Sequence, residues 1–169
     1  MIENKKMLRK KGTYLLIFRL LREKKGLRIG SLGLHDLGEG IYVYVGSAQG
    51  PGGVFSRICR HLRKEKKIKW HIDYLTTLND CEILGAIIFH ATERLECRIA
   101  EKLIDSGFRY PIHKFGSTDC KCPAHLFIID NLERLIHVFN ASNIRFSFYT
   151  VKELNQICSQ IASKFLRPS

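Results

Sequence analysis

The rest of this sequence can be placed relative to the segment GIYVYVGSAQG, residues 40–50, which joins an apolar run to a glycine-rich turn. Within it, aliphatic residues alternate with tyrosines: Ile41, Val43 and Val45 with Tyr42 and Tyr44. Because successive side chains of a strand point to opposite faces, this alternation predicts one aliphatic and one phenolic face. Glycine adopts backbone conformations closed to other residues, so we expect the strand to stop at Gly46 and the chain to turn sharply.

The residues after this turn have the period of a basic, amphipathic helix. Apolar residues fall on one side of it: Val54, Phe55, Ile58, Cys59 and Leu62. Arg57 and His61 are four residues apart, so they should lie together on the flank of the helix. The sequence therefore predicts a positively charged helix directly after the central strand.

The composition is that of one globular domain with a basic surface. The chain has 169 residues, 45% of them hydrophobic, which is enough for a sizeable core. Its 28 Lys and Arg exceed its 16 Asp and Glu, giving a formal net charge of +12 and favouring a polyanionic partner such as nucleic acid. No apolar run is long enough for a signal-peptide core or a membrane span, so we expect a cytoplasmic protein without membrane contact.

The six cysteines are scattered through apolar patterns: Cys59, Cys81, Cys97, Cys120, Cys122 and Cys158. This distribution predicts reduced, buried thiols, with disulfides left open for a thermophilic protein.

The rest of the chain predicts an α/β fold, in which a small mixed, mainly antiparallel sheet is flanked by helices. Further strands are expected at residues 11–20, 27–34, 70–75, 81–89 and 126–129. Helices are expected at residues 93–106 and after two capping boxes, Asp130 with Glu133 and Thr150 with Glu153. We expect a core domain over residues 1–129 and a helical extension, residues 130–169, on the same domain.

The expected strand at residues 70–75 would place His71 and Asp73 side by side on one face. Such a pair could relay protons or bind a metal, and the alternative is an ordinary surface hydrogen bond.

Two tyrosine triplets on successive strands resemble those of a known family. Gly12-Thr13-Tyr14 lies in the first expected strand and Tyr44-Val45-Gly46 in the central one, and the helix with Arg57 and His61 follows. In this order they resemble the GIY-YIG nuclease superfamily, and in particular an uncharacterised, largely archaeal branch of it. The resemblance covers about residues 12–129 and implies a metal-dependent endonuclease that hydrolyses phosphodiester bonds in DNA.

The resemblance also implies site residues. Tyr14 or Tyr44 would act as a general base or orient one, and Arg57, assisted by His61, would bind the scissile phosphate. Glu96 would hold one Mg²⁺ or Mn²⁺ ion. The expected DNA contacts are cationic: Arg57, Arg60, Arg63 and Lys64. We expect both phenols, the guanidinium and the carboxylate to line one open cleft, with His61 at its edge.

Glu96 is also singled out by the pattern of its own helix. It falls in the middle of the apolar arc of residues 93–106, where an unpaired carboxylate is costly. Glu93, at one side of the same arc, is the rival for the metal. A salt bridge to an arginine of the helix is the alternative to metal binding.

Cys120, Cys122 and His125 are close enough in sequence to suggest a zinc site. Structural zinc sites usually start from two cysteines separated by two or more residues, and the only further candidate ligand considered in this segment is His113. The sequence thus leaves this site without a clear fourth ligand.

The nuclease family keeps an asparagine after its metal-binding glutamate, and no Asn lies between Glu96 and His125. Ser117, Asp119 or His125 would have to take its place. The alternative function is therefore a non-catalytic nucleic-acid-binding module on the same fold.

Overall fold

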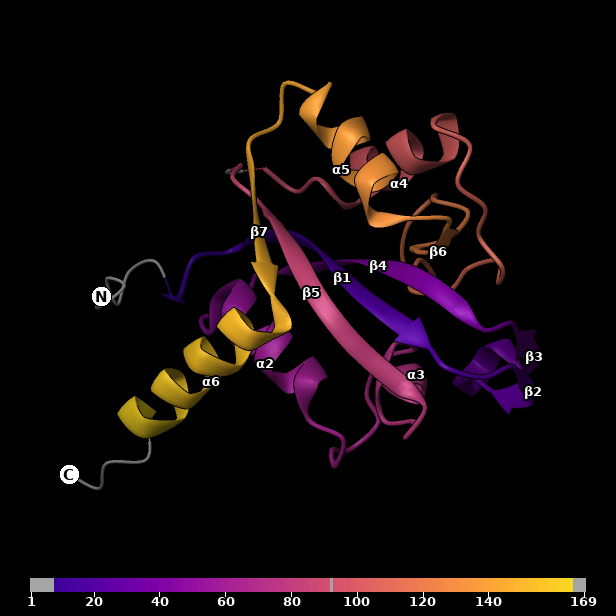
Figure 1. Cartoon of the computed structure of the whole chain (residues 1–169), viewed down its shortest axis with the longest axis horizontal. Coiled ribbons are helices and arrows are strands. Elements are labelled where there is room, and N and C mark those ends of the chain that lie inside the picture. The colour runs from indigo at the N-terminus through magenta and orange to yellow at the C-terminus, as the bar shows by residue number, and fades with distance from the viewer. Residues whose placement is uncertain (1–7, 92, 166–169) are drawn as a thin grey trace.

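A five-stranded antiparallel sheet forms the centre of the molecule (Figure 1). A computed structural model describes residues 8–91 and 93–165. The strands are β1 (Gly12–Leu20), β4 (Gly40–Ala48), β5 (Cys81–Phe89), β6 (Leu126–Ile129) and β7 (Phe146–Thr150). Their order across the sheet is β6-β4-β1-β5-β7, and β1 is buried at every residue except Arg19 because it pairs on both edges. The expected α/β fold with a mainly antiparallel sheet is confirmed, and all pairings between the described strands are antiparallel.

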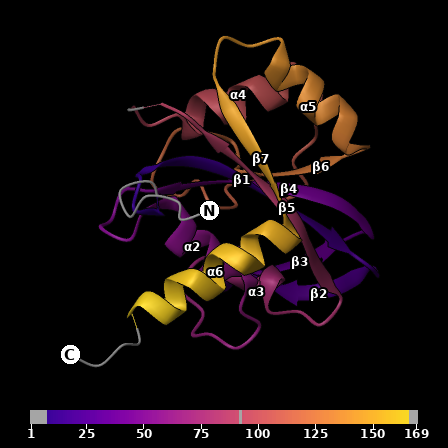
Figure 2. The ribbon, with the colours of Figure 1, turned by 60° about the vertical axis from the view of Figure 1, so that its left-hand side comes forward.

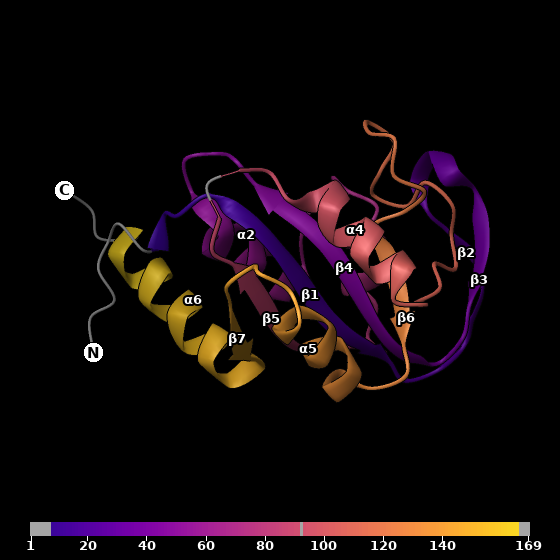
Figure 3. The same cartoon turned by 90° about the horizontal axis from the view of Figure 1, so that it is seen from above.

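Helices cover both faces of this sheet (Figures 2 and 3). One face carries α2 (Gly53–Leu62), α3 (Asp73–Thr76) and α6 (Val151–Phe165), and the other carries α4 (Glu96–Asp105) and α5 (Leu132–Asn140). Two hydrophobic cores result, one on each face of the sheet. Tyr42 of β4 lies in the core under α2, whereas Val43 and Val45 lie in the core under α4, as the alternation of the central segment predicts.

The segment between β1 and β4 differs from the single strand expected at residues 27–34. It forms a separate two-stranded sheet from β2 (Lys24–Arg28) and β3 (Leu34–Leu37), joined through the short 3₁₀ helix η1 (Gly30–Leu32). Gly30 and Gly33 have φ of 49° and 88°, a backbone conformation that only glycine adopts readily, so the chain turns where a strand was expected. Figure 3 shows this small sheet at the end of the molecule far from α6.

Residues 70–75 do not form the expected strand. The Asp73 carboxylate accepts hydrogen bonds from the backbone N–H groups of Lys69 and Trp70, at 2.8 and 3.0 Å, and α3 begins at this residue. A side chain that binds nearby backbone in this way competes with strand pairing. His71 and Asp73 therefore do not form the expected pair, and Asp73 pairs with Arg60 instead.

The segment after residue 130, for which only helices were expected, also supplies a strand. β7 pairs with β5 at the edge of the sheet, and α6 follows it directly. The capping box at its start is confirmed, because the Thr150 N–H donates to the Glu153 carboxylate at 2.7 Å and the Glu153 N–H donates to Thr150 Oγ1 at 3.3 Å.

The other two helix starts differ from the expected ones. α5 is capped by the Asn131 side chain, which accepts a hydrogen bond from the Arg134 N–H at 2.8 Å, and not by Asp130. α4 begins at Glu96, later than the expected helix at residues 93–106. Among the described residues, each helix is too short or too polar to cross a lipid bilayer.

One pair of cysteines is oxidised, contrary to the expectation of reduced thiols. Cys59 of α2 and Cys158 of α6 form a disulfide, and these two helices lie side by side in Figure 1. The remaining cysteines are free: Cys81, Cys97, Cys120 and Cys122.

Candidate active site and metal cluster

A pocket of about 550 Å³ opens beside the C-terminal end of β4. This end of the strand extends beyond the last residue of β4 that pairs with β6, Tyr44, which pairs with Leu126. Its wall combines β4, α2, the residues before α3, the start of α4 and the loop before β6. Three cationic side chains contribute to the lining: Arg57, Lys69 and Arg94. Two carboxylates, Glu96 and Asp119, also line it, so the cations exceed the anions and the pocket suits an anionic ligand.

Three of the five expected catalytic side chains line this pocket: Tyr44, Arg57 and Glu96. Tyr14 and His61 are instead buried, with 0% and 1% of their surface exposed. The expectation that both phenols would line one open cleft with His61 at its edge is therefore wrong. The physical reason is that Tyr14 belongs to the middle strand of the sheet and is covered by α2.

Glu96 reaches the pocket from the opposite face of the sheet. α4 packs on the face away from Tyr14, and its first residue, Glu96, lines the pocket. The start of α4 is held by the Thr13 hydroxyl, which accepts a hydrogen bond from the Leu95 N–H at 3.1 Å. Thr13 therefore helps to place Glu96, which nothing in the sequence indicated. Glu93, the rival for the metal, is exposed and lies 3.5 Å from Arg98.

A buried polar chain lies behind the pocket. The Tyr14 hydroxyl lies 2.7 Å from His61 Nε2, and His61 Nδ1 lies 3.9 Å from the Asp73 carboxylate. That carboxylate accepts two hydrogen bonds from Arg60, at 2.7 and 2.9 Å. Within residues 8–91 and 93–165, His61 Nδ1 has no hydrogen-bond partner. These polar groups of β1, α2 and α3 therefore lie close together as two hydrogen-bonded pairs, Tyr14 with His61 and Asp73 with Arg60, with no hydrogen bond between the pairs.

The four expected DNA contacts, which lie on α2 and just after it, do not all reach the pocket. Arg60 is committed to Asp73, and the Lys64 ammonium donates to backbone carbonyls of Thr76 and Leu78. Arg63 is exposed. Of this expected set, Arg57 alone lines the pocket.

Burial determines the protonation of the aromatic groups. It raises the pKa of Tyr14 well above the ordinary value of 10.0, and it raises the pKa of Tyr44 despite the opposing charge of Arg57. Both phenols are therefore protonated at neutral pH, which disfavours either one as a ready-made base. Burial also lowers the pKa of His61 to about 3, so this imidazole is neutral.

Trp70 orders the cationic side of the pocket. The guanidinium of Arg57 lies 4.3 Å from the centroid of the Trp70 ring, and that of Arg60 lies 4.4 Å from it. Cation–π contacts of this kind contribute about 0.5–2 kcal/mol, depending on solvent exposure. A guanidinium over a ring uses its face for the contact and keeps its N–H edge free for a ligand. The Trp70 contact therefore positions Arg57 without occupying its hydrogen-bond donors.

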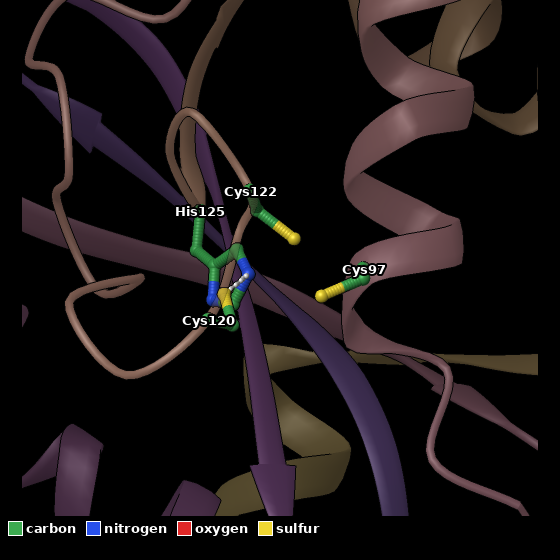
Figure 4. Close-up of side chains that lie close together, drawn as sticks. All are labelled: Cys97, Cys120, Cys122 and His125. Carbon is green, nitrogen blue, oxygen red and sulfur yellow. Dashed lines mark hydrogen bonds between the residues drawn. The ribbon is translucent and has the colours of Figure 1, made fainter.

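Four potential metal ligands meet at the wall of the same pocket (Figure 4). Cys97 comes from α4, and the others come from the loop before β6: Cys120, Cys122 and His125. Their ligand atoms all lie within 4.8 Å of one another, and Figure 4 shows the sulfurs of Cys97 and Cys122 pointing toward each other. These four residues could hold a metal ion.

Sequence reasoning found three members of this cluster and missed the fourth. His113, the fourth ligand considered from the sequence, is exposed and contacts the Tyr110 ring instead, with 6.4 Å between ring centroids. Cys97 completes the set because α4 packs beside the loop. Its spacing from Cys120 carries no recognisable metal motif, so the sequence held no signal for it.

The fold and the site together define an antiparallel α/β protein with a cationic pocket beside a cysteine–histidine cluster. Domain of unknown function DUF123 matches residues 13–146, so the chain belongs to the DUF123 family. Comparisons with curated proteins and with solved structures found no match.

Proposed function

We propose that this protein is a metal-dependent endonuclease that hydrolyses phosphodiester bonds in DNA. The proposal depends on one observation: Tyr44, Arg57 and Glu96 come from three separate elements and line one open pocket. Bringing a phenol, a guanidinium and a carboxylate together contributes little to stability. It suits a phosphate, because Arg57 can donate two parallel hydrogen bonds to its oxygens.

The pocket groups have separable tasks in this proposal. Arg57 binds the scissile phosphate and neutralises charge that develops on it. Protonated Tyr44 accepts a hydrogen bond from the attacking water and orients it. His71 adds a donor: its Nδ1 accepts from the Gly116 N–H at 3.1 Å and burial lowers its pKa, so the neutral ring carries its proton on Nε2.

Tyr14 and His61 act as positioning residues rather than as catalytic groups. The His61 ring packs edge-on against Tyr44, with 6.2 Å between ring centroids, and its Nε2 is tied to the Tyr14 hydroxyl. The pair therefore limits the movement of the Tyr44 ring. In this proposal the first triplet thus supplies Tyr14, which helps to position Tyr44 of the second triplet.

Glu96 is the residue that would hold the divalent ion. Mg²⁺ and Mn²⁺ prefer oxygen ligands, and Mg²⁺ is commonly bound through one or two carboxylates while several waters remain. Glu96 and Asp119 both line the pocket, which has room for such waters, so the donor set fits. A bound ion would supply positive charge near the leaving oxygen and lower the pKa of adjacent water. For the cysteine-rich cluster the matching ion is zinc, because thiolates favour it over magnesium.

The decisive experiment is the Glu96→Gln substitution, which removes the metal-binding charge and keeps the side-chain volume. Wild-type protein should cleave plasmid or single-stranded DNA with Mg²⁺ or Mn²⁺ and be inactive with a chelator. The variant should lose at least about 100-fold in rate while binding DNA normally, because even changes to groups behind a metal ligand cost about 10- to 100-fold. Glu93→Gln, a matched change at the exposed rival, should cleave like wild type. Wild-type rates in Glu96→Gln would reject the assignment.

A non-catalytic nucleic-acid-binding module is the second candidate, and the protonation of both phenols favours it. It predicts DNA binding that weakens steeply with salt, because neutralised phosphates release counterions, but no cleavage with any divalent ion. Binding that salt does not affect would contradict both candidates and indicate a small-molecule pocket.

A further inference from the structure

The geometry points to a closed zinc site formed by Cys97, Cys120, Cys122 and His125, which clamps the start of α4 to the loop of residues 116–125. We infer that this clamp places Glu96 in the pocket. The zinc site itself is independent of nuclease activity, and only the catalytic meaning of Glu96 rests on the proposed function.

The spacing of the ligand atoms suits tetrahedral zinc. With Zn–S bonds of about 2.3 Å and Zn–N bonds of about 2.0 Å, the S···N edge of the tetrahedron is about 3.5 Å and the S···S edge about 3.8 Å. Cys120 Sγ lies 3.6 Å from His125 Nε2, and all four ligand atoms lie within 4.8 Å of one another. Side-chain shifts of about 1 Å or less would complete the coordination.

The ligand set identifies both the ion and its role. Three thiolates and one imidazole form a soft donor set that selects zinc over Mg²⁺ or Ca²⁺. Structural zinc sites use four protein ligands, whereas catalytic sites keep one position open for water. Because the cluster supplies four ligands, the ion would be structural although three of its ligands line the pocket: Cys97, Cys120 and His125.

Groups around the cluster hold His125 in place and offset the negative charge that thiolate ligands would carry. The backbone of His125 is held at both of its polar groups: its N–H donates to the Phe115 carbonyl and its carbonyl accepts from the Val45 N–H, both at 2.8 Å. The Lys114 ammonium donates to the carbonyl oxygens of Cys120 and Cys122, at 2.9 and 3.2 Å. Zinc with three thiolates carries a net negative charge, which this nearby ammonium offsets.

The clamp reaches the pocket from two sides. Cys97 directly follows Glu96 in the first turn of α4, so fixing the sulfur also fixes the carboxylate. At the other end of the loop, the Gly116 N–H donates to His71 Nδ1, and a Cβ added at Gly116 would lie 2.9 Å from the Tyr44 ring. An ion in the cluster therefore joins two walls of the pocket.

Zinc content tests the site directly. Protein produced with zinc in the medium should contain one zinc per chain. Mutating a residue that only hydrogen-bonds to a metal ligand typically lowers metal affinity by roughly 10- to 100-fold, and Cys122→Ser, which removes a ligand itself, should lower zinc affinity by at least as much. Cys81→Ser is the matched control, because Cys81 is a free, buried cysteine outside the cluster and should leave zinc unchanged. Should Cys122→Ser fail to fold, Co²⁺ in the wild-type protein should still give thiolate charge-transfer bands and intense visible bands. Metal-free wild type, or Co²⁺ without these bands, would overturn the site.

Trp70, the only tryptophan, reports on the clamp because it lines the pocket. Removing zinc with a chelator should shift Trp70 emission and lower the melting temperature by at least about 5 °C, and Zn²⁺ but not Mg²⁺ should restore both. Unchanged emission and melting after zinc removal would reject the clamp even if zinc binds. Zinc-loaded protein that fails to cleave DNA would count against the nuclease alone.

Discussion

The ring of Tyr14 in β1 lies directly over Gly46 in β4, the residue with which it pairs across the sheet. A Cβ added at Gly46 would lie 2.4 Å from Tyr14 Cζ and 2.5 Å from its hydroxyl. The two tyrosine triplets of the sequence therefore meet in space, because the glycine of the second makes room for the phenol of the first. This contact also directs the Tyr14 hydroxyl to His61.

Gly46→Ala should consequently destabilise the protein. Tyr14 is completely buried and cannot swing away, so the added methyl group should lower the free energy of unfolding by about 1–3 kcal/mol, measured by urea denaturation. Gly38→Ala is the control, because no atom of the described residues lies within 4 Å of a Cβ there. Equal stability of the two variants would show that the Tyr14 ring is free to move.

Tyr14→Phe should weaken both the fold and the proposed activity. It leaves His61 Nε2 buried without a partner, which should cost about 1–3 kcal/mol in unfolding free energy. If the pair positions Tyr44, the cleavage rate at saturating DNA should also fall, by about 10-fold or more, with little change in DNA affinity. The control is Tyr42→Phe, whose hydroxyl donates to the Gly38 carbonyl at 2.7 Å, away from the pocket. Loss of cleavage in that control as well would argue against a specific role for Tyr14.

His61 should make stability fall as the pH falls below about 6.5. Burial lowers its pKa in the folded protein from 6.5 to about 3, so between these values the unfolded chain binds a proton that the folded protein does not. Stability should therefore decrease with falling pH across this window, with a slope of up to about 1.4 kcal/mol per pH unit from this residue.

The measurement is a series of urea denaturations from pH 7 to about pH 4. Burial also lowers the pKa values of His71, His90 and His125, so the slope of His61→Gln must be compared with that of wild type. This variant should have the shallower slope, whereas His113→Gln, at an exposed position, should match wild type. A His61→Gln slope as steep as that of wild type would indicate that His61 is protonated in the folded state.

The Cys59–Cys158 disulfide should stabilise the packing of α6 on α2. It joins residues separated by 99 positions, and loops of this size are associated with about 2–5 kcal/mol of stabilisation. The double substitution Cys59→Ser with Cys158→Ser should lower the unfolding free energy by an amount in this range, and a reducing agent should have no further effect on it. Cys81→Ser, which alters a free thiol, should leave the response to reducing agent intact. A wild-type protein insensitive to reduction would contradict this prediction.

Local periodicity predicted most of the sheet and failed where local polar or glycine chemistry intervened. The apolar run of β1 and the alternation of β4 are properties of short segments, so the sequence was sufficient for both. At residues 70–75 the same alternation was misleading, because the Asp73 carboxylate binds backbone N–H groups just before it. β7 was missed although its aromatic residues favour a strand, because this edge strand is nowhere fully buried and has no continuous apolar run.

What the sequence determined by itself is the order of the two tyrosine triplets, the basic helix that follows them and the presence, though not the first residue, of the amphipathic helix with Glu96. The tertiary structure alone decided that Tyr14 is buried while Tyr44 reaches the pocket, because this depends on which strand occupies the middle of the sheet. It also decided that Cys97 joins Cys120, Cys122 and His125. Periodicity shows which side chains share a face of one element, whereas the meeting of two elements depends on how both pack against the sheet.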